Sequence, residues 1–139
     1  MDAILGAVWL YTGDVERSAR FYRDAVGLRH IGGESHAEHF DCRNIRLSLH
    51  LGEPAPSGFL VFVVEDARAE YEAMRSRGVR FDSEPHREEF GGLVADFRDP
   101  DGHHLFIWQL PGPDDPAYES ERPLVEHYRT LAAALGRRV

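Results

Sequence analysis

The chain has 139 residues, enough for one domain or for two small modules that share a core. Its 16 basic and 24 acidic residues give a net charge of −8, which argues against nucleic acid or an anionic membrane as a partner. No apolar run is long enough to span a bilayer, and the first ten residues lack the basic start of a signal peptide. The one cysteine, Cys42, excludes an internal disulfide and predicts a cytoplasmic location.

The first half of the chain predicts one helix among four strands. Apolar residues 3–11 indicate a buried strand, and apolar positions within residues 15–25 recur at helical spacing. Asp14 stands at the N-cap of that helix, and Gly27 follows its end, where a left-handed conformation is common. Shorter strands are predicted at residues 28–31, 36–42 and 45–51. In the last of these, Arg46, Ser48 and His50 share one face, and Ile45, Leu47, Leu49 and Leu51 share the other.

The same order of elements recurs after a linker at residues 52–58, which contains two prolines. A strand is predicted at residues 59–64 and a helix at 67–77, between the N-cap Asp66 and Gly78. Further strands are predicted at residues 79–81, 93–97 and 104–110. The two halves therefore predict one β-α-β-β-β module used twice, in an α+β fold. An α+β sandwich whose elements merely recur is the less favoured alternative.

The last part of the chain differs in composition from the two modules. Residues 111–123 are rich in proline and acidic residues and predict a tail. Residues 124–135 predict a helix that docks on the body of the protein or on a partner subunit, and we favour these over a membrane surface. The apolar stripe of this helix consists of Leu124, Tyr128, Leu131 and Leu135.

Two short motifs point to a known family. Asp99-Pro100-Asp101-Gly102 predicts a tight turn, because proline fixes φ, aspartate bonds the nearby backbone and glycine accepts a positive φ. The first half carries the pattern Asp-x-x-x-Ser-x-x-Phe-Tyr and then Gly-Leu, at Asp14, Ser18, Phe21, Tyr22, Gly27 and Leu28. With both motifs at repeat spacing, residues 3–110 resemble the vicinal oxygen chelate superfamily. That superfamily includes glyoxalase I, extradiol dioxygenases and bleomycin-resistance proteins.

The resemblance implies a glyoxalase- and bleomycin-resistance-like domain over residues 1–110. Its paired modules, at residues 1–52 and 58–110, would form a curved, cup-shaped mixed sheet, followed by the tail and C-terminal helix at 111–139. Relatives form homodimers, so we expect a homodimer here. The resemblance also implies a position for a divalent ion on the concave face of the sheet.

The residues at that metal position do not suit a metal. The family's ligand positions correspond here to Ala7, Ser48, Phe59 and Phe106. A hydroxyl alone is a poor ligand for a transition metal. A shift of the alignment by two residues brings only Trp9, Val61 and Trp108 to these positions. We therefore expect no metal and no cofactor.

Aromatic residues stand at the positions that the resemblance places in the cup. Because side chains alternate along a strand, Trp9 and Tyr11 share a face of the first strand, and Phe106 and Trp108 share a face of the last. Such rings either fill the core or receive a flat organic ligand, and at these positions we weigh the two interpretations equally. The predicted ligand-binding residues are Trp9, Tyr11, Ser48, His50, Phe59, Val61, Phe106 and Trp108.

These observations predict metal-independent binding or sequestration of a small, flat, hydrophobic or cationic organic compound. Antibiotic resistance of the bleomycin type is the expected role, and Gly91-Gly92 resembles the antibiotic-binding branch of the superfamily. The acidic residues Glu38, Asp41 and Asp96 are candidates to orient a cation. Binding rather than catalysis is expected, and no catalytic residue is assigned.

An enzyme of the superfamily is the alternative. A lyase, isomerase or dioxygenase-like activity would use a displaced metal, at His39 and His50 with Glu38 or Asp41, or acid–base chemistry by His50. The partner of His50 in that chemistry would be Tyr11 or a nearby carboxylate. Solvated histidines at loops or strand edges are the favoured interpretation of this group. A third alternative is a domain that has lost its chemistry and serves in regulation or protein binding.

Overall fold

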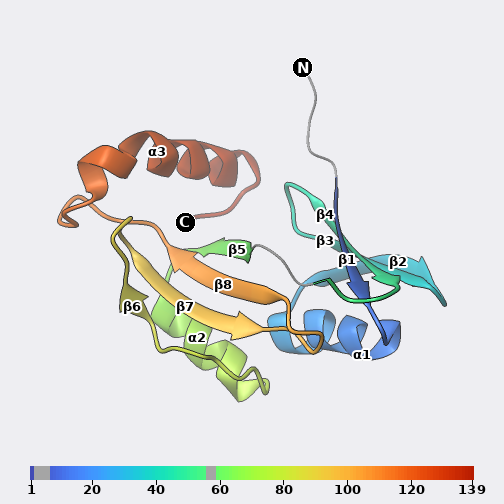
Figure 1. The fold of residues 1–139 in the computed structure, drawn as a ribbon. Helices are drawn as coiled ribbons and strands as arrows, with labels where there is room; N and C mark the ends of the chain where they lie inside the picture. The colour runs from blue at the N-terminus through green and yellow to red at the C-terminus, as the bar shows by residue number, and fades with distance from the viewer. Residues whose placement is uncertain (2–6, 56–58) are drawn as a thin grey trace. The chain divides into compact units, whose positions relative to one another are not determined.

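The computed structural model describes residues 1, 7–55 and 59–139 (Figure 1). Its contacts divide the chain into two units, one of residues 1–57 with 99–103 and one of residues 58–98 with 104–139. Residues 3–6 of the first predicted strand and residues 56–58 of the predicted linker lie outside the described residues.

The first unit contains a four-stranded sheet with helix α1 and its continuation η1. The strands lie in the order β1-β4-β3-β2, with β1 parallel to β4 and the other pairs antiparallel. The elements are β1 (Ala7–Thr12), α1 (Val15–Arg20), η1 (Phe21–Val26), β2 (Arg29–Glu34), β3 (Ala37–Asp41) and β4 (Arg46–Leu51). This order is the β-α-β-β-β module that the sequence predicts.

The helix of the first unit begins and ends at the predicted residues. The carboxylate of Asp14 accepts the backbone N–H of Arg17, so Asp14 is the N-cap. The α-helix passes into a π-helical turn at Phe21 and ends at Gly27, which has a φ of 90°. In this conformation the backbone N–H of Gly27 donates to the carbonyl of Tyr22.

The core of the first unit lies between this helix and one face of the sheet. Tyr22 from η1, Phe40 from β3, and Leu47 and Leu49 from β4 are buried there. Alternation along β4 then places Ser48 and His50 on the opposite face, as predicted. Leu51, which alternation places on the same face as Leu47 and Leu49, is exposed at the end of the strand.

The second unit repeats the topology of the first. Its strands lie in the order β5-β8-β7-β6, with β5 parallel to β8, and helix α2 lies on one face of the sheet (Figure 1). Asp66 is the N-cap of α2, as predicted. The elements are β5 (Phe59–Val64), α2 (Ala67–Ser76), β6 (His86–Arg87), β7 (Leu93–Arg98), β8 (His104–Gln109) and α3 (Tyr118–Ala134).

The strand predicted at residues 79–81 is wrong. The ladder with β7 is formed by β6, where His86 pairs with Val94. Phe81 makes only an isolated bridge to Phe97, and its ring packs in an aromatic cluster with Tyr71 and Phe97. The apolar character of residues 79–81 therefore reports core packing rather than strand pairing.

Helix α3 also departs from the prediction in its start and in its buried face. It begins at Tyr118 and continues through Pro123, within the stretch assigned to a tail. Leu124 and Leu135 of the predicted stripe are exposed. The face that packs on the sheet consists of Tyr118, Val125, Tyr128 and Ala132.

Candidate functional site

The open face of the first sheet, opposite its helix, carries exposed aromatic side chains. Trp9 is 56% exposed and Tyr11 is 46% exposed. In the parallel ladder Trp9 pairs with Ser48 and Tyr11 pairs with His50, and in the neighbouring ladder His39 pairs with Ser48. Since direct partners point to the same side of a sheet, these five residues share one surface. We call Trp9, Tyr11, His39, Ser48 and His50 the aromatic face.

His50 lies at the centre of the aromatic face. Its imidazole stacks on the indole of Trp9, with ring centroids 4.2 Å apart and planes inclined by 26°. The ring of Tyr11 lies 6.4 Å from His50, and the ring of His39 approaches edge-on at 6.0 Å. This arrangement presents a broad, ring-lined surface of the kind on which flat organic molecules stack.

Some polar side-chain atoms of the aromatic face have a hydrogen-bond partner, and one does not. Ser48 is fully buried, and its hydroxyl lies 2.9 Å from Nδ1 of His39, so each of these groups already has a partner. Nε2 of His50 is buried without any hydrogen-bond partner. Burial, with the nearby His39, His36 and Arg46, lowers the pKa of His50 below its ordinary value. This shift favours the neutral form of the His50 imidazole.

The acidic residues predicted to orient a cation are engaged elsewhere. Asp41 forms an ion pair with Arg29 and accepts the backbone N–H of Arg43. Glu38 pairs across the sheet with Leu49, on the helix side, and contacts His30. The structure therefore does not bring Glu38 or Asp41 together with His39 and His50 as a metal site.

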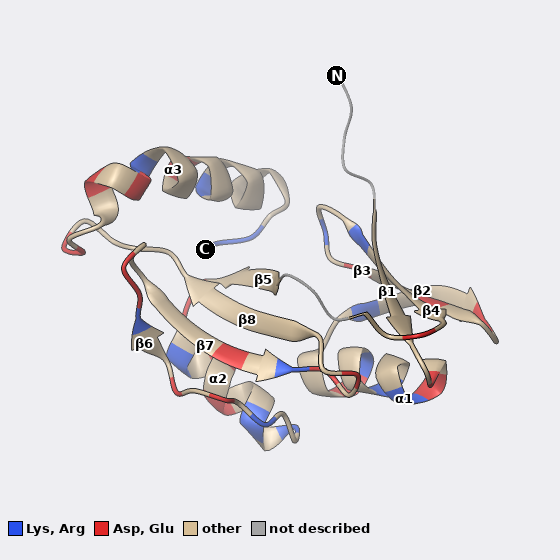
Figure 2. Ribbon diagram, in the orientation of Figure 1, with Lys and Arg blue, Asp and Glu red and all other residues tan. Residues whose placement is uncertain are grey.

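Three strands that carry exposed or partly exposed aromatic rings, β1, β5 and β8, are free of charged residues apart from histidine. Strands β1, β5 and β8 contain no lysine, arginine, aspartate or glutamate, and they are uniformly tan in Figure 2. On the open face of the second sheet, Asp96 pairs with Phe106 and accepts the hydroxyl of Ser83. The overall negative charge therefore gives little local preference for a cationic ligand at the rings.

The second sheet exposes part of its own open face. Phe59 is 59% exposed, and Val61 beside it is also exposed. The ring of Phe59 lies 4.3 Å from that of His104 and 5.7 Å from that of Phe106. Phe59, Val61 and Phe106 of the predicted ligand-binding set thus form, with His104, an apolar surface on the second unit.

Trp108 lies in the core of the second unit. It is only 5% exposed, and it packs with Val94 and Val125 under α3. Its indole N–H donates to the carbonyl of Gly91 over 3.0 Å. The prediction that Trp108 lines an open cup therefore does not match this structure, in which the alternative of a core ring applies. Sequence reasoning missed this because it did not place α3 over β8.

Gly91-Gly92 has a structural role in holding that indole. Both residues have a positive φ, and a Cβ on Gly92 would clash with the carbonyl oxygen of Gln109. Asp115 also accepts the backbone N–H of Gly92 over 2.8 Å. The glycine pair thus lets the chain approach β8 closely and seats Trp108.

The family's metal positions do not fit a metal in this chain. Phe59 and Phe106 offer only ring carbons, and they pack against each other. Ala7 has no donor atom, and the Ser48 hydroxyl is taken by His39. The first-sphere ligands that a divalent transition metal requires are missing from these positions.

One trio of potential cation ligands does occur in the described part of the chain. Ligand atoms of Asp99, Asp101 and His103 lie within 4.8 Å of one another. Asp99 accepts the hydroxyl of Tyr22 over 2.7 Å and lies 2.6 Å from Nδ1 of His103. Asp101 accepts from Ser18 and from Arg17. These contacts hold the Asp99–Gly102 turn against α1 and η1, and they explain why the two sequence motifs occur together.

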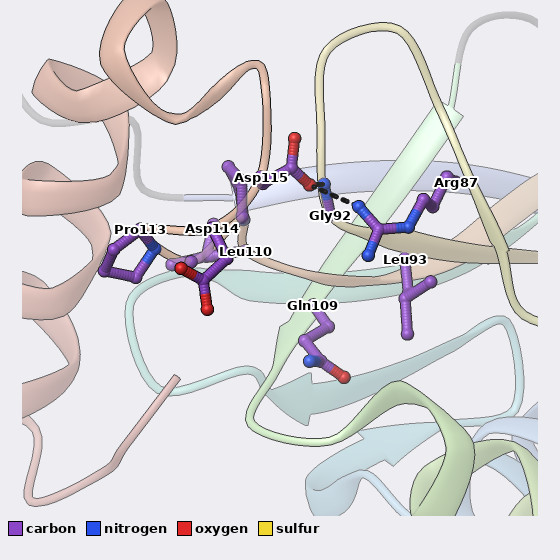
Figure 3. Close-up of a pocket in the computed structure, with 10 residues that line it drawn as sticks. Arg87, Gly92, Leu93, Gln109, Leu110, Pro113, Asp114 and Asp115 are labelled. Carbon is purple, nitrogen blue, oxygen red and sulfur yellow. Dashed lines mark hydrogen bonds and ion pairs between the residues drawn. The ribbon is translucent and has the colours of Figure 1, made fainter.

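A separate cavity of about 240 Å³ lies in the second unit (Figure 3). Two of its charged side chains, Arg87 and Asp115, form an ion pair with a nitrogen–oxygen distance of 3.6 Å. Sequence reasoning did not identify it, because its wall includes the segment that was assigned to a tail. It is lined by Arg87, Gly92, Leu93, Gln109, Leu110, Pro111, Gly112, Pro113, Asp114 and Asp115.

None of the described helices is both long enough and apolar enough to cross a membrane.

Comparisons with known proteins agree with this fold. A family model described as the Glyoxalase/Bleomycin resistance protein/Dioxygenase superfamily matches residues 4–107. Uncharacterized protein YraH of Bacillus subtilis (strain 168) is 31% identical over an alignment of 120 positions, which covers 73% of this chain and 94% of the relative.

Two solved structures illustrate the range of similar proteins. TnmS3, an antibiotic binding protein from Streptomyces sp. CB03234, has a TM-score of 0.70 and 23% identity, over 81% of this chain and 99% of its own. A lactoylglutathione lyase from Agrobacterium tumefaciens has a TM-score of 0.61 and 23% identity, over 78% and 94%. The chain is therefore a member of the glyoxalase/bleomycin resistance protein/dioxygenase superfamily.

Proposed function

We propose that the protein binds a small, flat organic compound on its aromatic face, without a metal. The observation that carries this proposal is the exposed stack of Trp9 on His50, flanked by Tyr11. A solvent-exposed indole of this size loses apolar surface to a stacked ligand, which favours binding by about 25 cal/mol per Å² of area buried. The absence of charge on β1 favours an uncharged or hydrophobic ring system over a cation.

Sequestration of such a compound would make the protein a resistance protein. An antibiotic binding protein shares the fold, which supports this role at the level of architecture. A cytoplasmic location belongs to the same proposal, since a sequestering protein works where its ligand accumulates. A homodimer is also proposed, on the family resemblance alone.

A thermal-shift screen of planar aromatic compounds tests the proposal. A compound that binds only the native state raises the melting temperature, by an amount that grows with its concentration. The same rise is expected with and without EDTA. Trp9→Ala should weaken binding by on the order of 2 kcal/mol, and Trp108→Phe, which changes a buried ring, is the matched control. A screen in which every stabilising compound acts equally on Trp9→Ala would refute the proposed site.

Acid–base catalysis at the same face is the second candidate function. Its specific support is His50, whose neutral form is favoured by burial and whose unpartnered Nε2 belongs to a ring 6.4 Å from that of Tyr11. A lyase with this fold is known. Turnover of a bound compound, abolished in His50→Gln and retained in His127→Gln, would establish catalysis. Recovery of unchanged ligand after long incubation would exclude it for that ligand.

A further inference from the structure

One polar atom on the aromatic face has no hydrogen-bond partner. Among the buried side-chain nitrogen and oxygen atoms of residues 7–55 and 59–139, only Nε2 of His50 is unsatisfied. A buried polar group without a partner costs free energy, so almost every such group in a native protein is paired. An exception needs a reason, and a bound ligand is one that fits this position.

The surroundings of His50 allow a ligand to reach this nitrogen. The imidazole ring as a whole is partly exposed, and the neighbours stacked on it and beside it, Trp9 and Tyr11, are themselves exposed. The torsion that turns an imidazole about its bond to Cβ has broad minima. Rotation about this torsion changes the direction of Nε2 and leaves the backbone of β4 in place.

We propose that Nε2 of His50 is the hydrogen-bonding point of the ligand site and that the ligand is a flat aromatic compound carrying a ring hydroxyl. This inference rests on the proposed function and specifies its ligand class. Nε2 of a neutral imidazole is an acceptor in one tautomer and a donor in the other. A hydroxyl group serves both tautomers, because it can donate to the bare nitrogen or accept from its N–H.

Other histidines of the protein lack this combination of features. His39 shares the aromatic face, but its Nδ1 is bonded to the hydroxyl of Ser48. His103 is buried with its Nδ1 against Asp99. His104 lies against an exposed ring, Phe59, in a tilted arrangement, and neither of its ring nitrogens is a buried atom without a partner. The match of an exposed stacking partner with an unsatisfied nitrogen therefore singles out His50 among the described residues.

The test compares 2-naphthol with naphthalene, two probes of the same ring area that differ in one hydroxyl. Binding is followed by the emission of Trp9 in a Trp108→Phe background, which leaves one tryptophan. We expect 2-naphthol to bind about tenfold more tightly, the effect of one well-formed hydrogen bond. In His50→Phe the stacking surface is kept, and the two probes should bind equally.

Two further variants separate a binding role from a structural one. His50→Gln, which keeps a hydrogen-bonding end, should retain part of the preference for 2-naphthol, and the exposed His127→Phe should retain all of it. His50→Phe should also raise the melting temperature, by about 2–6 °C, because it removes an unsatisfied polar atom from a buried position. If His50 had only a structural role, the His50→Phe variant would have a lower melting temperature than the wild type.

The outcomes distinguish this inference from the proposed function. Equal affinity of the wild-type face for the two probes overturns the inference and leaves flat-ligand binding intact. A preference that persists in His50→Phe overturns it as well, whether or not the variant is more stable. If neither probe nor any other planar compound perturbs Trp9, the proposed function fails and the inference fails with it.

Discussion

The two units share one topology but differ in how far the face of the sheet opposite α1 or α2 is buried. The repeat places His50 and Trp108 at equivalent positions, since Tyr11 pairs with His50 in one unit and Val63 pairs with Trp108 in the other. In the first unit the rings beside this position stay exposed, whereas in the second α3 packs over it. A segment outside the repeat thus converts one of two equivalent surfaces into core.

The largest effect is expected where this difference is tested directly. Trp108→Ala should cost roughly 3–5 kcal/mol of unfolding free energy, because it leaves a cavity under α3 and an unpaired carbonyl at Gly91. Trp9→Ala should cost no more than about 1.5 kcal/mol, the value of an aromatic pair at an exposed site. Urea denaturation of both variants measures the contrast. Comparable losses would show that the two faces are equally buried.

A second prediction concerns what supports the first unit. Tyr22 is fully buried, and its hydroxyl donates to the carboxylate of Asp99. Burial, with the neighbouring Asp99, raises the pKa of Tyr22, so the hydroxyl keeps its proton. Tyr22→Phe should cost about 1.5–3 kcal/mol, as expected for a hydrogen bond to a charged group. Tyr11→Phe, at an exposed ring, is the control and should change stability by about 0.5 kcal/mol or less.

The pH dependence of stability sharpens the comparison further. The pKa of His50 is lower in the folded state than its ordinary value of 6.5, so the unfolded chain binds more protons in that range. The contribution of the neutral His50 to the free energy of unfolding is therefore fully present above pH 6.5, and it is lost as the pH falls through the pKa of His50 in the folded state. Melting temperatures of the wild type minus those of His50→Phe should decline on acidification below pH 6.5. If the wild-type melting temperature instead rises relative to that of His50→Phe on acidification, the predicted direction is wrong.

The smallest expected effect is that of metals. The family's ligand positions hold ring carbons and a hydroxyl that is already bonded. EDTA, and micromolar Zn²⁺, Mn²⁺, Fe²⁺ or Ni²⁺, should leave the melting temperature unchanged, since only a ligand of the native state stabilises it. A rise of several degrees with one of these ions would disprove metal independence.

Much of the fold was accessible to sequence reasoning because local signals agreed with one another. Asp14 and Asp66 cap their helices as predicted, and Gly27 ends the first helix in the left-handed conformation. Alternation along β4 correctly separated Leu47 and Leu49 from Ser48 and His50. Each of these features depends on neighbours in sequence, which a single sequence displays.

The errors arose where distant segments decide the outcome. Trp108 alternates like a face residue, but α3 buries it, and periodicity along β8 contains no trace of that helix. The strand at residues 79–81 was inferred from apolar side chains that serve the Tyr71 cluster. The unpaired nitrogen of His50 could not be predicted at all, because it depends on which groups of three strands meet around it.

The central claim is that the aromatic face of the first unit is the ligand-binding surface and that the second tryptophan is core. Single-tryptophan variants test it most directly, with Trp108→Phe reporting from Trp9 and Trp9→Phe reporting from Trp108. A planar compound that binds should quench the emission of Trp9 and leave that of Trp108 almost unchanged. Quenching of Trp108 with Trp9 unaffected would contradict the account.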